Sequence, residues 1–243
     1  MNPHLIMPMG GAGSRFKKDG YTIPKPLIEI NGKPFFYWAT RSVSKFIEVK
    51  DITFVVLEKH INDFGIDASI KEHFPDGNII AIPEVLPGPV YTAIEGVRSL
   101  EDDAPVIFND CDHMFRCNKL EETMRQEQME EDGILLTFES DKACYSYVKY
   151  KDKKIIGTAE KQVVSNHAIC GAYIFKNKRL FIEASDKYLS NCPYKECFMS
   201  GLYNILCDES KNIKDHLLDF HVEFGTPEEY EEAQKSNYFT ELR

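Results

Sequence analysis

The sequence predicts an α/β fold with three layers, α/β/α, around a mixed and mostly parallel sheet. Strand and helix patterns alternate from residue 5 to residue 108, and strands then follow one another between residues 134 and 175. A glycine-rich loop directly follows the first strand. Because right-handed crossovers bring the carboxyl ends of parallel strands to one edge of the sheet, we expect ligands to bind at that edge.

The first half of the chain, residues 1–116, carries the alternating pattern. Apolar runs predict strands at 5–9, 52–57, 78–82 and 105–108. Apolar residues at helical spacing predict helices at 35–47, at 61–74 with an interruption at Gly65, and at 89–100. Pro34 and Pro89 stand where the first turn of a helix tolerates proline, which supports two of these helix starts.

The second half, residues 117–243, is expected to extend the sheet with mixed or antiparallel strands. The patterns predict a polar, exposed helix at 119–131 and strands at 134–138, 145–150, 155–159 and 168–175. Helices are predicted at 178–189, at 195–207 and from Pro227 onward. We expect one domain, 1–243, in which this half covers the open end of the first and completes a ligand pocket.

Composition limits the partners and the compartment. The 243 residues include 39 acidic and 29 basic side chains, a formal net charge of −10, so a nucleic-acid partner is not expected. The seven cysteines are odd in number and scattered, which indicates reduced thiols and a cytoplasmic location. We find no stretch long enough to span a membrane and no signal peptide in residues 1–8, so no membrane contact is expected. The oligomeric state stays open, a homodimer included.

The glycine-rich loop is suited to a phosphate chain. Gly10, Gly11 and Gly13 leave backbone N–H groups open to an anion, because no Cβ blocks its approach. Arg15 adds a planar cation, and Lys25 is a point charge between two prolines that stiffen the segment. Neither the P-loop pattern nor the dinucleotide fingerprint matches this loop. A tight turn with surface charges is the structural alternative.

Two carboxylates follow the strand at 105–108. Asp110 and Asp112 flank one residue and can point the same way from an extended chain. Such a pair can hold Mg²⁺, which binds through one or two carboxylates and completes its shell with water and phosphate oxygens. The alternatives are an Asx turn and a zinc site at Cys111, His113 and Cys117, although that spacing fits no standard zinc motif.

These motifs resemble those of the nucleotidyltransferases that make nucleotide sugars and related activated phosphates. The resemblance rests on the loop GGAGSRF and the later segment IPKPLIEINGKP, and it extends more loosely over almost the whole chain. It implies a Rossmann-like GT-A fold and a Mg²⁺-dependent enzyme. This enzyme would join a nucleoside triphosphate to a sugar 1-phosphate or a similar phosphorylated molecule and release pyrophosphate. Residues 1–116 would then bind the nucleotide and residues 117–243 the acceptor.

The resemblance also implies roles for residues of the first half. Arg15 and Lys25 would stabilise charge on the leaving pyrophosphate, and Asp112 would hold the metal. Glu223, in VEFGTPEEY, would complete the metal site at a place where aspartate is commoner. The nucleotide would contact Met9, Gly10, Gly11, Ala12, Gly13, Ser14, Glu84, Gly88, Thr92 and Asp110.

On the acceptor side, the resemblance points to Glu160, Lys161, Gly171 and Glu196. Lys161 would orient the acceptor's phosphate and Glu160 would reach a hydroxyl, unless the two form an ordinary solvated charge pair. Gly171 lies within a predicted strand, where a ligand can approach the backbone. Glu196 follows Lys195, which stands where the family usually has glycine.

Two other functions stay open on the sequence. A GT-A glycosyltransferase would share the paired aspartates but would not need the loop with Pro-Lys-Pro. A catalytically idle, nucleotide-binding relative would have a damaged site, whereas Arg15, Lys25 and Asp112 are all present. The sequence names neither the base nor the acceptor, and Tyr145 and Tyr147 would also suit a non-sugar phosphate such as phosphocholine.

Overall fold

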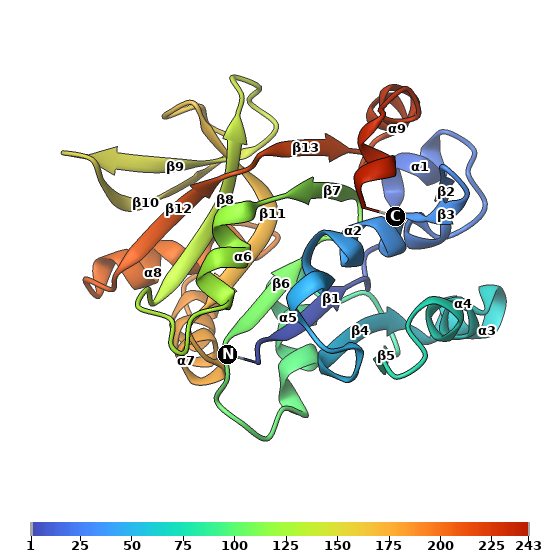
Figure 1. Ribbon diagram of the computed structural model, residues 1–243, viewed down its shortest axis with the longest axis horizontal. Coiled ribbons are helices and arrows are strands. Elements are labelled where there is room, and N and C mark those ends of the chain that lie inside the picture. Colours follow the sequence, from blue (N-terminus) through green and yellow to red (C-terminus); the bar gives the residue numbers. More distant parts are fainter. Residues whose placement is uncertain (1, 243) are drawn as a thin grey trace.

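The structure, a computed structural model, describes residues 2–242 and contains a nine-stranded sheet between helices (Figure 1). The sheet follows the order β10-β9-β11-β6-β1-β4-β5, and β8 and β12 continue from β11. Its strands are β1 (His4–Pro8), β4 (Ile52–Leu57), β5 (Asn78–Ile82), β6 (Val106–Asn109), β8 (Gly133–Glu139), β9 (Ser146–Lys151), β10 (Lys154–Glu160), β11 (His167–Phe175) and β12 (Ile213–Leu217). Two short pairs lie outside it, β2 (Glu29–Ile30) with β3 (Lys33–Pro34) and β7 (His113–Arg116) with β13 (Phe220–Glu223).

Helices cover both faces of the sheet. One face packs against α2 (Phe35–Val43), α4 (Ile66–His73) and α6 (Asn118–Met124). The other packs against α5 (Pro89–Arg98), α7 (Lys178–Leu189) and α8 (Leu202–Asp208). The remaining helices are α1 (Ser14–Lys18), α3 (Glu58–Phe64), α9 (Pro227–Ala233) and the 3₁₀ turns Lys25–Leu27, Ser44–Phe46, Val49–Asp51, Met199–Gly201 and Tyr238–Glu241. The predicted three-layer fold with a mixed, mostly parallel sheet is therefore confirmed.

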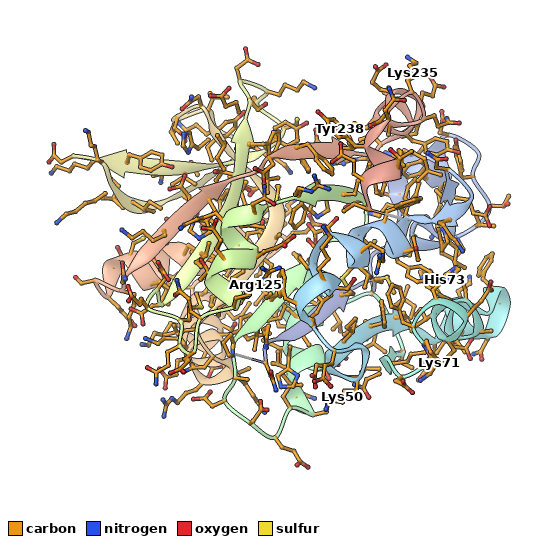
Figure 2. The ribbon with its side chains drawn as sticks, viewed as in Figure 1. Lys50, Lys71, His73, Arg125, Lys235 and Tyr238 are labelled. Carbon is orange, nitrogen blue, oxygen red and sulfur yellow. The ribbon has the colours of Figure 1, made fainter. Side chains whose placement is uncertain are left out.

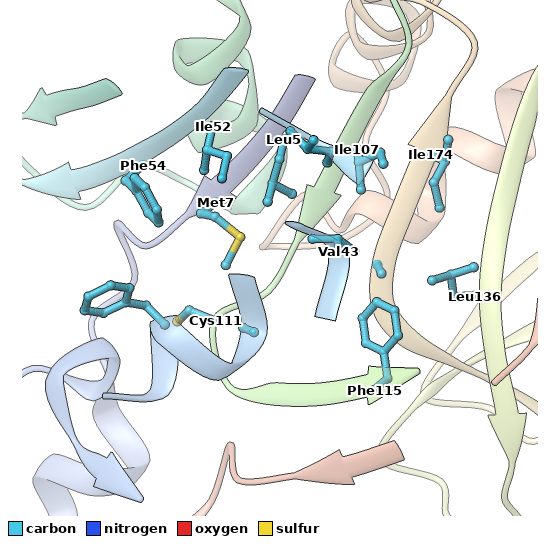
Figure 3. Packing of buried hydrophobic residues seen from close by; sticks show 14 of the residues in the cluster. Leu5, Met7, Val43, Ile52, Phe54, Ile107, Cys111, Phe115, Leu136 and Ile174 are labelled. Atoms are coloured by element: carbon cyan, nitrogen blue, oxygen red, sulfur yellow. The ribbon is translucent and has the colours of Figure 1, made fainter. Parts of the chain in front are cut away.

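The alternation of side chains along β1 creates two separate cores. Leu5 and Met7 point to the α2 side, where they pack with Val43 (Figure 3). Ile6 points to the opposite side, toward α5. A Cβ on Gly96 of α5 would lie only 2.3 Å from Cγ2 of Ile6, so glycine allows this helix to approach the sheet closely. Parallel pairing of β1 with β4 and β6 places the carboxyl ends of all three strands at one edge.

A third apolar cluster joins the start of the chain to its end. Phe35 and Trp38 of α2 contact Phe224 and Phe239, with ring centroids 4.6 and 4.8 Å apart respectively. Phe16 of α1 is buried in the same cluster, 5.8 Å from Phe35. The cluster therefore fixes α1 and α9 beside one another, although more than 200 residues separate them (Figure 1).

Several predicted elements were wrong in extent. The polar helix predicted at 119–131 ends at Met124 and is not fully exposed, because Leu120 and Met124 form an i, i+4 apolar pair that packs into the core. The helix predicted at 195–207 begins only at the 3₁₀ turn Met199–Gly201. Backbone hydrogen bonds explain this difference, since Cys197 donates to Pro87 (3.4 Å) and accepts from Val90 (3.3 Å).

Strands β7, β12 and β13 were not predicted. Each contains polar or charged residues, as in IKDHL of β12 and FHVE of β13, so the apolar signal is weak. Strands β4 and β5 match the predicted ranges, and β11 joins the two predicted halves by pairing antiparallel with β6. The second half thus extends the first half's sheet as expected.

Charged side chains cover the outside of the fold, where Arg125 and Lys235 are 75% and 70% exposed (Figure 2). Every helix within residues 2–242 is too short or too polar to cross a membrane.

Candidate active site

The glycine loop runs from the end of β1 to the start of α1 and forms a wall of a cavity of about 470 Å³, here named the loop cavity. Gly13 has φ +61° and directly precedes α1, which places Arg15 in the first turn of that helix. The loop cavity is lined by Pro8, Gly10, Gly11, Ala12, Gly13, Ser14, Arg15, Phe16, Lys25, Val85, Leu86, Gly88, Pro89, Thr92, Asp110, Cys111, Asp112, Glu196, Phe198 and Gly225. It is thus bounded mainly by the first half of the chain.

A second cavity of about 500 Å³, here named the sheet cavity, adjoins the first and includes residues of β9, β10 and β11. Its lining residues are Arg15, Pro89, Asp110, Asp112, His113, Cys144, Tyr145, Ser146, Glu160, Ile169, Cys170, Gly171, Tyr173, Phe198, Met199, Glu223, Gly225, Thr226 and Glu229. Both cavities are lined by Arg15, Pro89, Asp110, Asp112, Phe198 and Gly225. Two ligands bound in the two cavities would therefore meet at Arg15 and the paired aspartates.

Lys25 and Asp112 form an ion pair at this junction. The Nζ of Lys25 donates to Oδ2 of Asp112 at 2.7 Å, and their side chains are 26% and 22% exposed. Burial opposes both charges, but each charge stabilises the other. The pKa of Lys25 is consequently raised above its ordinary value, and the pKa of Asp112 is lowered below its own. Both groups are charged at neutral pH.

Asp110 and Glu223 are the other acids in this region with shifted pKa values. Burial raises the pKa of Asp110 to about 7, and the charge of Asp112 contributes in the same direction. Burial likewise raises the pKa of Glu223 to about 7, although the Tyr145 hydroxyl donates to its Oε2 at 2.6 Å. The site therefore concentrates carboxylates that a bound cation would stabilise in their ionised form.

Strand pairing brings Glu223 close to Asp112. Strands β7 and β13 are antiparallel, and Glu223 lies opposite His113, the residue after Asp112. The N–H of Phe224 also donates to the carbonyl oxygen of Asp112 at 3.0 Å. Residues separated by more than 100 positions in the sequence therefore line one cavity, as the predicted pairing of Asp112 and Glu223 requires.

A buried polar network supports the ends of β6, β7 and β13. The Nε2 of His113 lies 3.0 Å from Oδ1 of Asn109, and its Nδ1 lies 3.1 Å from Nε2 of His221. Asn109 in turn donates to the carbonyl oxygen of Ala39 in α2 at 3.0 Å. Burial lowers the pKa of His113 to about 4, so its imidazole is neutral. The network fixes the segment that carries the two aspartates.

On the β10 side, Glu160 lines the sheet cavity. Its Oε2 accepts hydrogen bonds from Ser146 and from Ser200, the latter at 3.1 Å. Lys161, the next residue, has its Nζ 5.1 Å from the ring centroid of Phe198, a cation–π contact. Phe198 lines both cavities, so Lys161 lies close to the junction although its own side chain is exposed.

The structure brings most of the predicted residues together but not all of them. Met9, Glu84 and Lys161 line neither cavity. The Met9 side chain is 1% exposed and packs in the core on the α2 side. Glu84 is exposed to solvent in the bend after β5, and Lys161 is held in a turn with φ +52°. The other predicted residues line the loop cavity, the sheet cavity or both.

Sequence reasoning missed several lining residues of the sheet cavity. Phe198 was assigned to a helix, and only its extended backbone brings it to the junction. Tyr173 follows Gly171 by two residues on β11, so the alternation of the strand could have suggested it. Ser146 and Ser200 lie on unrelated segments, and no local pattern connects them to Glu160.

Two carboxylates beside the junction are of the residue type that binds magnesium. Asp112 and Glu223 both face the sheet cavity, and carboxylate oxygens are the protein ligands that Mg²⁺ prefers. Within residues 2–242, His, Cys, Asp and Glu side chains form no group of three or more that could hold a metal. A cation held by these two residues would therefore need oxygens from a bound phosphate as well, which is the usual arrangement for Mg²⁺.

A glycine loop beside a lysine and paired carboxylates, at the carboxyl edge of a parallel sheet, is typical of an enzyme that binds a phosphate chain. The profile of the nucleotidyl transferase family matches residues 4–238, so this chain belongs to the nucleotidyl transferase family. The family resemblance and the enzyme class predicted from the sequence are thereby confirmed: the protein is a nucleotidyltransferase. No curated protein gives a significant match to the sequence.

Solved structures share the fold at low sequence identity. The nucleoside-diphosphate-sugar pyrophosphorylase from Vibrio cholerae superposes with a TM-score of 0.81 at 23% identity, over 96% of this chain and 100% of that one. The inositol-1-phosphate CTP transferase from T. maritima superposes with a TM-score of 0.75 at 16% identity, over 100% of this chain and 94% of that one. An apo UDP-glucose pyrophosphorylase superposes with a TM-score of 0.76 at 18% identity, over 99% of this chain and 100% of that one. At these identities the likeness establishes the fold alone.

Proposed function

We propose that this nucleotidyltransferase joins a nucleoside triphosphate to a phosphorylated small molecule, a sugar 1-phosphate or a similar phosphate, and releases pyrophosphate in a Mg²⁺-dependent reaction. The observation that carries the proposal is the junction of the two cavities at Arg15, Asp110 and Asp112. The loop cavity takes the triphosphate and the sheet cavity takes the acceptor. Their reacting phosphates then meet beside the charged groups.

The reaction is an in-line displacement at the α-phosphorus. An oxygen of the acceptor's phosphate forms a new P–O bond to this phosphorus, and the bond to the β-phosphate oxygen breaks with departure of pyrophosphate. Two anions repel each other, so catalysis consists of positioning and charge neutralisation. The N–H groups of Gly10 to Gly13 cradle the triphosphate, and Arg15 stabilises the charge on the leaving pyrophosphate. Lys25 adds positive charge beside Asp112.

Asp112 and Glu223 would hold the magnesium ion, which supplies positive charge to phosphate oxygens when bound. The Tyr145 hydroxyl orients Glu223 through its hydrogen bond of 2.6 Å. Lys25 keeps Asp112 ionised, since the pair lowers the pKa of this carboxyl group. The chain's own part is thus to present ionised oxygens in a partly buried site.

The acceptor would contact Glu160 and Gly171 in the sheet cavity and Glu196 on the loop-cavity side. Lys161, which lines neither cavity, would reach the acceptor's phosphate from its position beside Phe198. The relatives named above act on different substrates: by their names, one is an inositol-1-phosphate CTP transferase and another a UDP-glucose pyrophosphorylase. The base and the acceptor of this enzyme therefore have to be found by experiment.

A thermal-shift series with ATP, CTP, GTP, UTP and dTTP, each with and without Mg²⁺, tests the proposal. A ligand at about 100 times its dissociation constant stabilises the folded state by about 2.7 kcal/mol, which is readily measured. We expect a selective, Mg²⁺-dependent shift with one triphosphate, followed by pyrophosphate release when the acceptor is added. A shift with nucleotide diphosphate sugars but with no triphosphate would contradict it and favour a glycosyltransferase.

A further inference from the structure

We propose that Cys192 and Cys197 form a reversible disulfide on oxidation by a peroxide, and that this disulfide weakens triphosphate binding in the loop cavity. Disulfide formation is independent of the proposed function, whereas its effect on triphosphate binding rests on that function. Both cysteines are free thiols in the structure. They stand at the two ends of the segment CPYKEC, between α7 and the 3₁₀ turn Met199–Gly201.

The two thiols lie next to each other because the segment between them folds back. The Sγ of Cys192 donates to the carbonyl oxygen of Tyr194 at 3.6 Å, and the thiols of Cys192 and Cys197 are joined by a side-chain hydrogen bond. Cys197 belongs to the buried cluster on the α5 side, and Cys192 packs against the same cluster. The segment contains neither helix nor strand. A small movement within it therefore brings the two sulfur atoms to bonding distance.

Cys192 has the surroundings of a reactive thiol, and Cys197 has those of a resolving thiol. Cys192 is partly exposed, so a small peroxide reaches it. Burial raises the pKa of Cys192, but contacts with Cys197, with the phenol of Tyr188 and with the backbone of Tyr194 outweigh burial and lower this pKa below its ordinary value. Burial raises the pKa of Cys197 to about 12, and the hydrogen bond with Cys192 acts in the same direction. A thiolate at Cys192 beside a protonated thiol is typical of a redox-sensitive pair.

The oxidation has two steps, with hydrogen peroxide as the oxidant. The Cys192 thiolate attacks one peroxide oxygen, the O–O bond breaks, and a sulfenic acid forms as hydroxide leaves. The sulfur of Cys197 then attacks the sulfenic sulfur, and an S–S bond forms while the sulfenic hydroxyl leaves with the thiol proton as water. The two thiols together lose two electrons, which reduce the peroxide. A dithiol reductant restores both thiols by thiol–disulfide exchange.

Cys197 connects this pair to the wall of the loop cavity. Its N–H donates to the carbonyl oxygen of Pro87 at 3.4 Å, and its carbonyl oxygen accepts the N–H of Val90 at 3.3 Å. Both bonds are long, so a small shift of Cys197 weakens them. Gly88, which lines the loop cavity, packs so closely here that a Cβ on it would lie 2.6 Å from the N atom of Cys197. A shift of Cys197 is therefore transmitted to this wall.

The residues on either side of Cys197 also line the cavities. Glu196 lines the loop cavity, and Phe198 lines both. The ring centroid of Phe198 lies 5.6 Å from that of Tyr194, inside the segment that the disulfide would close into a ring. The S–S bond draws Cys197 toward Cys192 and away from its close fit against the loop-cavity wall. We therefore expect oxidation to weaken triphosphate binding.

Peptide mapping of the full chain tests the disulfide itself. The protein is treated with hydrogen peroxide, the remaining thiols are alkylated, and the digest is read by mass spectrometry with and without dithiothreitol. We expect a link between Cys192 and Cys197 that forms with peroxide and disappears with the reductant. Links that involve other cysteines only, or oxidation of Cys192 to the sulfonic acid without any link, overturn the inference.

Triphosphate affinity of the same samples tests the coupling. We expect the dissociation constant of the preferred triphosphate with Mg²⁺, measured by calorimetry, to be about fivefold higher or more in the oxidised protein and to recover with dithiothreitol. Cys192→Ser should bind like the reduced wild type and lose the response to peroxide. Cys207→Ser, on α8 and outside both cavities, is the control and should keep the response.

Two outcomes of the affinity measurement contradict the coupling. One is an unchanged affinity in protein that carries the link. The other is a response that persists in Cys192→Ser, which would assign it to another thiol, such as the exposed Cys144 of the sheet cavity. Triphosphate binding by the reduced wild type reports separately on the proposed function.

Discussion

The carboxylate of Asp110 lies directly against the backbone of Gly171, so closely that a Cβ at residue 171 would be 2.8 Å from Oδ2. The contact crosses from the end of β6 to the middle of β11, and the N–H of Asp110 donates to the carbonyl oxygen of Gly171 at 3.1 Å. Gly171 has φ +93°, a conformation that other residues rarely adopt. The strand therefore requires glycine at this point both for its backbone and for the position of an acid that lines both cavities.

Gly171→Ala should consequently destabilise the protein and lower its activity. Backbone strain at positive φ costs about 1–3 kcal/mol, and the clash with Asp110 adds to it. Gly20→Ala is a matched control, because Gly20 has φ +87° but no atom within 4 Å of a Cβ at that position. Urea unfolding should show a larger loss of unfolding free energy for Gly171→Ala than for Gly20→Ala. Adding Asp110→Ala to the Gly171→Ala chain should restore part of the lost stability. Equal losses for the two glycine variants would show that the contact with Asp110 has no effect.

Arg15→Ala should lower turnover by about 100-fold or more and leave the fold intact, since the side chain supplies positive charge at the junction of the two cavities. Pyrophosphate release measures the effect, and circular dichroism checks the fold. Lys18→Ala is the control, because Lys18 lies in the same short helix but is exposed and outside both cavities. Wild-type turnover in the arginine variant would contradict the catalytic role.

Asp112→Asn should abolish the stimulation of triphosphate binding by Mg²⁺. The change removes one proposed ligand charge and leaves Lys25 without its ionised partner. Thermal shifts with the preferred triphosphate, measured over a Mg²⁺ titration and after chelation, provide the test. Asp63→Asn in α3, an exposed residue, should behave like the wild type. A Mg²⁺ dependence that is unchanged in Asp112→Asn would place the metal elsewhere.

Acidification should destabilise the fold partly through His60. This side chain is 5% exposed, and its Nδ1 has no hydrogen-bond partner within the described chain. Burial lowers the pKa of the imidazole. The positive charges of Lys17 and Lys59 lower it further, and the negative charge of Asp63 raises it. The unfolded chain therefore binds a proton at a higher pH than the folded chain does. The associated stability is present above about pH 6.5 and is lost as the pH falls toward the folded pKa. Urea unfolding between pH 7.5 and 5 should show that the free energy of unfolding falls less steeply with pH in His60→Gln than in the wild type. The same slope in both proteins would contradict this prediction.

Asn177→Ala should cost about 1 kcal/mol of stability without changing turnover, because its side chain caps α7 outside both cavities. The Oδ1 of Asn177 accepts the N–H of Leu180 at 2.8 Å. Asn191→Ala, an exposed residue just after the same helix, is the matched control and should be close to neutral. A loss equal to that of the control would mean that the cap contributes nothing.

The sequence by itself determined the parts of this protein that depend on local patterns. Apolar runs located β4 and β5, helical spacing located α2 and α7, and the order of glycines and charges identified the loop that lines the loop cavity. Each of these signals lies within a few consecutive residues, where propensity and periodicity act.

The tertiary structure alone decided which distant residues share the site. Pairing of β13 with β7 brought Glu223 to Asp112, and a bulged β11 brought Gly171 to Asp110. Phe198 is extended and not helical, because the preceding Cys197 forms backbone hydrogen bonds with Pro87 and Val90. These strands are short or polar, and their partners are about 60 to more than 100 residues away in the sequence. No local sequence pattern therefore predicts these pairings. The sheet cavity is lined largely by residues that such contacts bring together, which is why the sequence named more of the lining of the loop cavity than of the sheet cavity.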